Sequence, residues 1–111
     1  MRLSYKVLSA LVLTTFSSTG LAAEPEFALV IEQHRFTPTE LVVPAGQKLR
    51  LVIENKDATP EEFESYELNR EKIVTAGSKI TVFVGPLKPG RYEFFGDFNP
   101  KTARGWLVVR P

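Results

Sequence analysis

Cysteine is missing from all 111 residues of the chain, and histidine and methionine each occur once, as His34 and Met1. Without a thiol the protein has no disulfide, no cysteine nucleophile and no thiolate ligand, so a blue-copper centre is excluded. The lone histidine has no nearby serine and acid pattern that would predict a catalytic triad. The glycines fall in turns and lack the spacing of a phosphate-binding loop. These absences leave little support for nucleophilic catalysis.

The chain also lacks a hydrophobic run long enough to span a membrane comfortably. A positively charged start, residues 1–6, is followed by an apolar stretch over residues 7–16 and then by mostly small residues. This order is typical of a secretory signal peptide, with Gly20-Leu21-Ala22 as the cleavage site. A membrane anchor is the alternative, but a spanning helix needs about 20 apolar residues. We therefore predict a signal peptide over residues 1–22 and an exported domain over residues 23–111, with no membrane insertion after cleavage.

The exported part has no excess of charge of either sign. From Glu24 onward there are 88 residues, with 12 Lys and Arg against 13 Asp and Glu, so the net charge is −1. This balance gives no electrostatic reason to expect a nucleic acid or an anionic membrane as partner. A domain of this size buries only about 60–68% of the surface of its unfolded chain. With no disulfide, the core must depend on β-branched and aromatic side chains, and this part supplies seven Phe, two Tyr and one Trp.

Turn signals divide the chain into short segments with the alternation of β-strands. A turn at Pro44-Ala45-Gly46-Gln47 and a Pro- and Gly-rich connection over residues 85–90 are the clearest of these signals. No segment has a convincing helical stripe of apolar residues. The pattern predicts an all-β sandwich. The strands we expect cover residues 27–31, 40–43, 48–55, 78–84, 92–97 and 105–109.

Several stretches resemble the cupredoxins, which have a Greek-key β-sandwich fold. They are the run from Phe36 to Lys48, the strand end Glu54-Asn55, the turn over residues 87–90 and the hairpin over residues 91–110. In copper-binding cupredoxins the last hairpin carries a Cys, then a His and often a Met.

Gly96 stands where the resemblance expects the Cys, Asn99 where it expects the downstream His, and Glu62 or Glu64 where it expects the upstream His. The Met position falls within residues 104–106. The resemblance therefore implies a cupredoxin-like frame without the type 1 copper ligands.

A more specific resemblance lies in the acidic segment, residues 61–74. Glu61-Glu62-Phe63-Glu64-Ser65 and the following residues 68–72 are similar to small periplasmic cupredoxin-like proteins associated with bacterial iron-uptake systems. This resemblance implies a periplasmic accessory protein that binds or hands over an iron or copper ion, or assists iron oxidation. It also implies an inner-membrane iron permease, or other periplasmic iron-uptake proteins, as partner.

The acidic segment also contains the best candidate ligands. In an extended chain Glu62 and Glu64 point the same way, and Asp97 lies on the loop expected at the same end of the sandwich. Oxygen ligands suit hard cations such as Fe(III), Mn(II), Ca(II) or Mg(II) better than Cu(I). We predict a metal site at Glu62, Glu64 and Asp97, with His34 as a further ligand if its loop folds over that end. Glu67 and Glu71 are more distant candidates.

Other interpretations remain open at this point. The acidic residues Glu61, Glu62, Glu64 and Glu67 can form a solvated face that is balanced by Arg70 and Lys72. A carboxylate can instead pair with Arg91 or Arg104, and His34 can be an ordinary surface histidine. The rival function is a metal-free interaction module that docks a partner's basic surface through the acidic strand.

Overall fold

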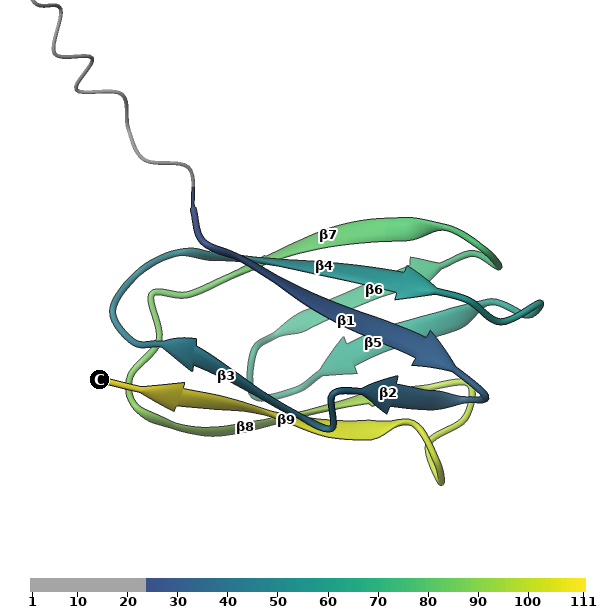
Figure 1. The fold of residues 1–111 in the computed structure, drawn as a ribbon. Coiled ribbons are helices and arrows are strands. Elements are labelled where there is room, and N and C mark those ends of the chain that lie inside the picture. The colour runs from purple at the N-terminus through teal and green to yellow at the C-terminus, as the bar shows by residue number, and fades with distance from the viewer. Residues whose placement is uncertain (1–23) are drawn as a thin grey trace, which may run out of the picture.

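The computed structural model describes residues 24–111, in which β-strands form two facing sheets (Figure 1). The predicted signal peptide, residues 1–22, lies outside the described residues. No helix within residues 24–111 is long and apolar enough to cross a membrane. The strands of the described part are β1 (Glu26–Glu32), β2 (Arg35–Thr37), β3 (Glu40–Pro44), β4 (Leu49–Asn55), β5 (Glu61–Ser65), β6 (Arg70–Val74), β7 (Lys79–Val84), β8 (Gly90–Gly96) and β9 (Arg104–Arg110).

The two sheets combine parallel and antiparallel strand pairs. One sheet has four strands in the order β2-β1-β4-β7, and the other has five in the order β3-β9-β8-β5-β6. β1 runs parallel to β4 and β3 runs parallel to β9, whereas the other pairs are antiparallel. The chain changes sheet after β2, β3, β4, β6 and β7. This arrangement confirms the predicted all-β sandwich.

The strands predicted from alternation and turn signals are confirmed, with ends that shift by no more than two residues. In β4, for example, the side chains of Leu49, Leu51 and Ile53 are fully buried and alternate with half-buried ones. The strand β2 was not predicted, because its three residues bury only one side chain, Phe36. One buried residue gives no periodicity from which a strand can be read. The acidic segment, residues 61–74, forms the hairpin β5–β6.

Three phenylalanine rings from both sheets meet in the core. Phe36, Phe63 and Phe94 are each at most 1% exposed. The ring of Phe36 meets that of Phe94 edge-to-face, with centroids 4.9 Å apart, and the centroids of Phe63 and Phe94 are 5.5 Å apart. Such aromatic contacts add to the burial of apolar area in a domain that has no disulfide. The trio therefore links β2 of one sheet to β5 and β8 of the other.

The connections at residues 33–34, 56–60 and 97–103 gather at one end of the sandwich, which we call the loop end. The backbone N–H groups of residues 33 and 34 donate to the Asp57 carboxylate at 2.7 and 3.0 Å. The buried Asn55 side chain holds the 56–60 connection by donating to the carbonyl of Thr59 and accepting from the N–H of Asp57. A shallow pocket at this end is lined by His34 and by residues 98–102. These contacts fix the loops that surround the candidate site.

Replacing Phe94 with alanine tests the aromatic core. The substitution removes the central ring of the trio, so we expect Phe94→Ala to lower the free energy of unfolding by about 3–5 kcal/mol. Urea unfolding of the mature domain measures this change. Ile73→Ala is the control, because Ile73 is 51% exposed on β6 and its truncation leaves no cavity. Equal losses for the two variants would contradict the central place of Phe94.

Candidate functional site

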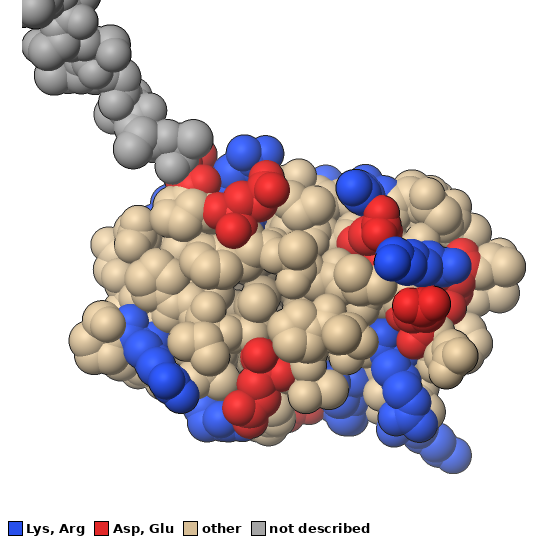
Figure 2. Space-filling view, in the orientation of Figure 1, with Lys and Arg blue, Asp and Glu red and all other residues tan. Residues whose placement is uncertain are grey.

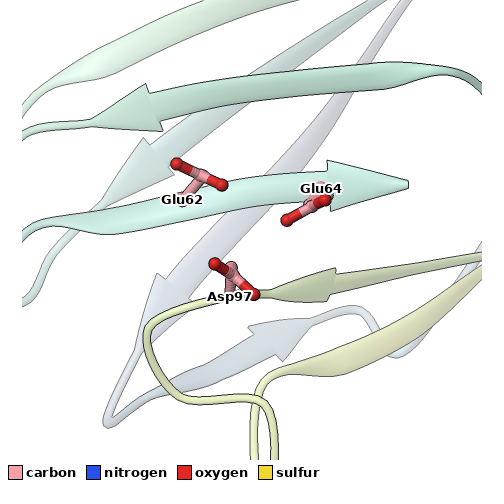
Figure 3. Close-up of side chains that lie close together, drawn as sticks. All are labelled: Glu62, Glu64 and Asp97. Carbon is pink, nitrogen blue, oxygen red and sulfur yellow. The ribbon is translucent and has the colours of Figure 1, made fainter. Parts of the chain in front are cut away.

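Three carboxylates come together on the outer face of the five-stranded sheet. Glu62 and Glu64 belong to β5, and Asp97 follows directly after β8 (Figure 3). One carboxylate oxygen of each residue lies within 4.8 Å of one from each of the other two. We call these three residues the carboxylate cluster.

Strand pairing explains why residues so far apart in sequence meet there. Phe63 points into the core, so its neighbours Glu62 and Glu64 point to the opposite face of β5. In the antiparallel pair of β5 and β8, Phe63 lies opposite Gly96. The N–H of Asp97, the next residue, donates to the Glu62 carbonyl at 2.9 Å. The structure thus brings together the three acidic residues that the sequence singled out.

The basic side chains on the neighbouring strand do not neutralise the carboxylate cluster. Arg70 and Lys72 belong to β6, but their side chains reach across to the other sheet. Arg70 Nε donates to the carbonyl of Phe83 at 2.8 Å, and Lys72 Nζ donates to that of Thr81 at 3.4 Å. Within residues 24–111, no cluster carboxylate forms an ion pair. The balancing role expected of Arg70 and Lys72 is therefore not what the structure shows.

Other acidic residues of the domain do have basic partners. Arg91 pairs with Glu40, with 2.8 Å between Nη2 and Oε1, and Arg104 pairs with Glu93. Neither arginine pairs with the cluster, which was the second interpretation left open by the sequence. Figure 2 likewise shows acidic and basic side chains next to one another on the face in view. The cluster stands out because its charges lack such neighbours.

Partial burial and neighbouring negative charges together raise the pKa of Glu62 from 4.5 to about 7. Partial burial contributes most, because it disfavours the charged carboxylate. The charge of Glu71, a hydrogen bond with its side chain, and the charges of Asp97 and Glu64 raise the pKa further. Glu62 therefore exchanges its proton near neutral pH, and a cation that binds here competes with that proton.

The remaining predicted candidates lie around the cluster rather than in it. Glu71 is opposite Glu64 across the β5–β6 pair, and Glu67 lies in the exposed turn after β5. His34 is at the loop end, as its predicted loop position required, but it is not among the residues whose ligand atoms meet. Its Nδ1 is 3.5 Å from Oδ2 of Asp57. The structure therefore separates His34 from the carboxylates with which it was grouped.

A buried carboxylate, Glu61, is missing from the predicted site residues. The hypothesis of a solvated acidic face included Glu61, but its side chain is only 1% exposed. Its carboxylate accepts hydrogen bonds from the N–H groups of Glu62 and Phe98 and from the Asn99 side-chain amide, at 3.0, 2.8 and 2.8 Å. The signal was present in the alternation, because Phe63 points inward and residue 61, two positions earlier, must do the same.

Glu61 also fills the space beside Gly96, which the resemblance equates with the copper-binding Cys. A Cβ atom on Gly96 would lie 2.5 Å from Cδ of Glu61. Asn99, equated with the downstream His, donates to the same carboxylate. The structure thus places Glu61, rather than Glu62 or Glu64, against both positions. A type 1 copper ion does not fit these residues, because no thiolate is available and a carboxylate fills the space.

Comparison with known proteins gives the family and the fold. Residues 6–109 match the family model described as a cupredoxin-like domain. An uncharacterized protein of Rickettsia prowazekii (strain Madrid E) is 49% identical over 84 residues, which are 76% of this chain and 67% of that protein.

Solved structures of two copper proteins are similar in fold. The metal binding domain of the Cu(I)-exporting P-type ATPase CopA of Streptococcus pneumoniae D39 has a TM-score of 0.69 and 15% identity, with 78% of this chain and 85% of that chain covered. Auracyanin A, a blue copper protein of Chloroflexus aurantiacus, has a TM-score of 0.68 and 15% identity, with 79% and 100% covered. At such low identity the similarity shows the fold alone. It confirms the predicted type of β-sandwich.

Truncation of Glu61 tests its structural role. Glu61→Ala leaves the N–H of Phe98 and the amide of Asn99 without their acceptor in a partly buried place and empties the space of a buried side chain, so we expect a loss of roughly 1–3 kcal/mol in the free energy of unfolding. Chemical denaturation measures the loss, and faster hydrogen exchange at the Phe98 amide locates it. Glu67→Ala, in an exposed turn, should change stability by less than about 0.5 kcal/mol. A Glu61→Ala protein as stable as the parent would refute this role.

The raised pKa of Glu62 predicts a pH dependence of stability. Because its folded pKa of about 7 exceeds the ordinary value of 4.5, the folded protein binds this proton more tightly than the unfolded chain does. The resulting stability is fully present below pH 4.5 and is lost as the pH rises through 7. Between about pH 5 and pH 8 we therefore expect Tm of the metal-free protein to fall more steeply for the parent than for Glu62→Gln. Parallel curves for the two proteins would contradict the raised pKa, and Glu32→Gln should follow the parent.

Proposed function

The chain belongs to the family of cupredoxin-like domains, and from this premise we propose that it is an exported metal-handling protein whose ion binds at the outer carboxylate cluster. The proposed ligands are Glu62, Glu64 and Asp97. The protein would bind iron, or a copper ion in a site that is not type 1, and pass it to an iron-uptake permease in the inner membrane. His34 is not part of this ligand set, because it lies with Asp57 at the loop end.

One observation carries the proposal: three carboxylates converge within 4.8 Å and have no basic partner within residues 24–111. Like charges at this separation repel each other. The pKa of Glu62 is raised mainly by partial burial and by Glu71, and the charges of Asp97 and Glu64 add to the shift. A divalent cation removes the repulsion and turns it into attraction at each oxygen. A bound cation would therefore supply the positive charge that the three carboxylates do not receive from the described part of the protein.

The chemistry of the cluster favours a hard ion that is held loosely. Three carboxylate oxygens suit Fe(II), Fe(III) or Mn(II), and the chain offers no sulfur donor that would hold Cu(I). The remaining coordination positions are left for water or for groups of another molecule. Asp97 is exposed, and near neutral pH an ion must compete with a proton for the carboxylate of Glu62. These features support transfer of an ion rather than its storage.

The iron-uptake context comes from the resemblance of residues 61–72 to periplasmic proteins of that kind. It agrees with the preference of carboxylates for iron over Cu(I). A periplasmic location follows from the predicted signal peptide over residues 1–22 and from the same resemblance. In that compartment an ion bound to the outer face of the sheet is accessible to a membrane permease.

The alternative function is a metal-free module that docks a partner protein through the same face. The observation that favours it is an open pocket beside the cluster, whose rim residue Tyr66 is 77% exposed. Exposed aromatic side chains next to uncompensated acidic ones are features of protein–protein contact surfaces. Metal titration separates the two functions, because only the first requires the protein to bind an ion.

Neutralising the cluster tests the proposed function. We expect Glu62→Gln combined with Glu64→Gln to weaken Fe(II) binding by at least about tenfold, because two charged ligands are lost. Asp97→Asn alone should act in the same direction. Anaerobic isothermal titration calorimetry of the mature domain measures the affinity, with Mn(II) and Cu(II) as further titrants.

The matched control removes the same number of charges from β1, by Glu26→Gln with Glu32→Gln. If control and cluster variants lose affinity equally, the effect is general electrostatics and the ligand assignment fails. If the parent protein binds none of the three ions, the docking module replaces the metal-handling function.

A further inference from the structure

A pocket of about 370 Å³ opens beside the carboxylate cluster on the outer face of the five-stranded sheet. Asp97 belongs to both, because it is a cluster residue and also lines the pocket. The other lining residues come from the turn after β5, from β8, from the 97–103 connection and from β9. They are Tyr66, Glu67, Glu93, Phe95, Pro100 and Arg104.

The walls of the pocket combine aromatic side chains with negative charge. The rings of Tyr66 and Phe95 are tilted by 58° to one another, with centroids 5.3 Å apart. Tyr66 is 77% exposed at the rim, whereas Phe95 lies beneath it and is only 8% exposed. Glu67 and Asp97 form no ion pair with any residue from 24 to 111. The basic lining residue Arg104 is already paired with Glu93. The pocket therefore presents two unmatched carboxylates beside an aromatic surface.

Hydrogen bonds hold the pocket walls in place. Ser65 is buried, and its Oγ donates to the carbonyl of Glu93 at 2.6 Å and accepts from the N–H of Leu68 at 3.2 Å. These bonds tie the turn that carries Tyr66 and Glu67 to β8. On the other side, the Arg104 guanidinium lies over the Phe95 ring, 5.4 Å from its centroid. The pocket is thus formed before any partner arrives, which lowers the entropy cost of binding.

We propose that this pocket receives an arginine side chain of a partner protein. The aliphatic stem of an arginine packs on Tyr66 and Phe95, and its planar guanidinium pairs with the carboxylates of Glu67 and Asp97. Guanidinium groups also stack on aromatic faces, and Arg104 already does so in this pocket. A neutral or acidic partner group would leave both carboxylates desolvated and unpaired. Charge complementarity therefore selects a basic side chain.

Sharing of Asp97 couples the pocket to the metal site, and this part of the inference rests on the proposed function. A guanidinium that pairs with Asp97 draws one ligand away from the ion and adds a positive charge beside it. Arginine in the pocket therefore weakens metal binding at the cluster. By linkage, metal at the cluster weakens arginine binding by the same factor. Docking of the partner would release the ion where the partner can receive it.

Arginine amide is a suitable probe of the pocket, and its first titration uses metal-free protein so that the result does not depend on metal binding. We expect shifts of the backbone amide signals of Tyr66, Glu67, Phe95 and Asp97 in heteronuclear NMR spectra, with a Kd on the order of millimolar for one side chain. Citrulline amide, which has the same α-amino group but an uncharged urea in place of the guanidinium, should produce no such shifts. Absence of shifts with arginine amide, or equal shifts with both compounds, would overturn the pocket assignment.

Variants locate the contact. Glu67→Gln with Tyr66→Ala should weaken arginine amide binding at least about fivefold, since one charge partner and one aromatic wall are lost. Glu32→Gln on β1, in the other sheet, makes a single charge change at a residue that does not line the pocket and should leave binding unchanged. Equal weakening by Glu32→Gln would show attraction by net charge alone and would overturn the assignment. Heteronuclear spectra of each variant also report whether it remains folded.

A second titration tests the coupling. With the cluster loaded with Mn(II), arginine amide should bind several-fold more weakly than in the metal-free protein, and added arginine amide should raise the Kd for Mn(II) by the same factor. Arginine amide binding that is unaffected by Mn(II) would overturn the release step while the pocket assignment stands. If Mn(II) does not bind but Fe(II) does, the same titration is made with Fe(II). If none of Fe(II), Mn(II) and Cu(II) binds, the proposed function and the release step are refuted together, and the metal-free titration still decides the pocket.

Discussion

The hydrogen bonds of one buried carboxylate, Glu61, hold the arrangement on which the outer face depends. Its oxygens accept from the N–H groups of Glu62 and Phe98 and from the Asn99 amide, so a single side chain ties the start of β5 to the connection after β8. Asp97 directly precedes Phe98, which is fixed in this way, and its own N–H donates to the Glu62 carbonyl. Without the Glu61 bonds the 97–103 connection would lose part of its attachment to β5, and Asp97 would be held less firmly beside Glu62. The outer cluster is therefore positioned from inside the sandwich.

The same carboxylate explains how the frame departs from copper-binding cupredoxins. Glu61 lies against Gly96 and Asn99, which the resemblance equates with two copper ligands, and it leaves no space for a side chain at Gly96. The interior position is therefore occupied by hydrogen bonds between protein groups. The three carboxylates of the cluster, Glu62, Glu64 and Asp97, lie together on the outer face of the sheet. Glu62 follows Glu61 directly on β5 and therefore points to the opposite face, so the buried carboxylate and the exposed cluster are one residue apart.

The fold could be predicted from the sequence because two local signals are strong. Turn residues mark where most strands end, and alternation of polar and apolar residues marks the strands themselves. The sequence also predicted that Glu62 and Glu64 share a face of their strand, and it placed Asp97 on the loop at the same end of the sandwich. The pairing of β5 with β8 then brings Asp97 to their side. The sequence did not reveal Glu61, because a run of acidic residues looks like a solvated surface until Phe63 fixes which of them point inward. The sequence could not fix the position of His34, because the position of a loop depends on tertiary contacts that no local pattern encodes. Here those contacts are with Asp57.

Electrostatics connects the cluster to its surroundings. Elsewhere on the domain acidic residues have basic neighbours, as in the pairs Arg91–Glu40 and Lys79–Glu54. On β6 the basic side chains instead reach the carbonyls of β7, where they join the two sheets, so their charges are unavailable to the cluster. The cost of this arrangement is repulsion among the carboxylates, which adds to the effect of partial burial in raising the pKa of Glu62. Under the proposed function that repulsion is what the ion relieves, and it is also why an arginine in the adjacent pocket competes with the ion. A face that is destabilised when empty and relieved by either of two cations is suited to exchanging one for the other.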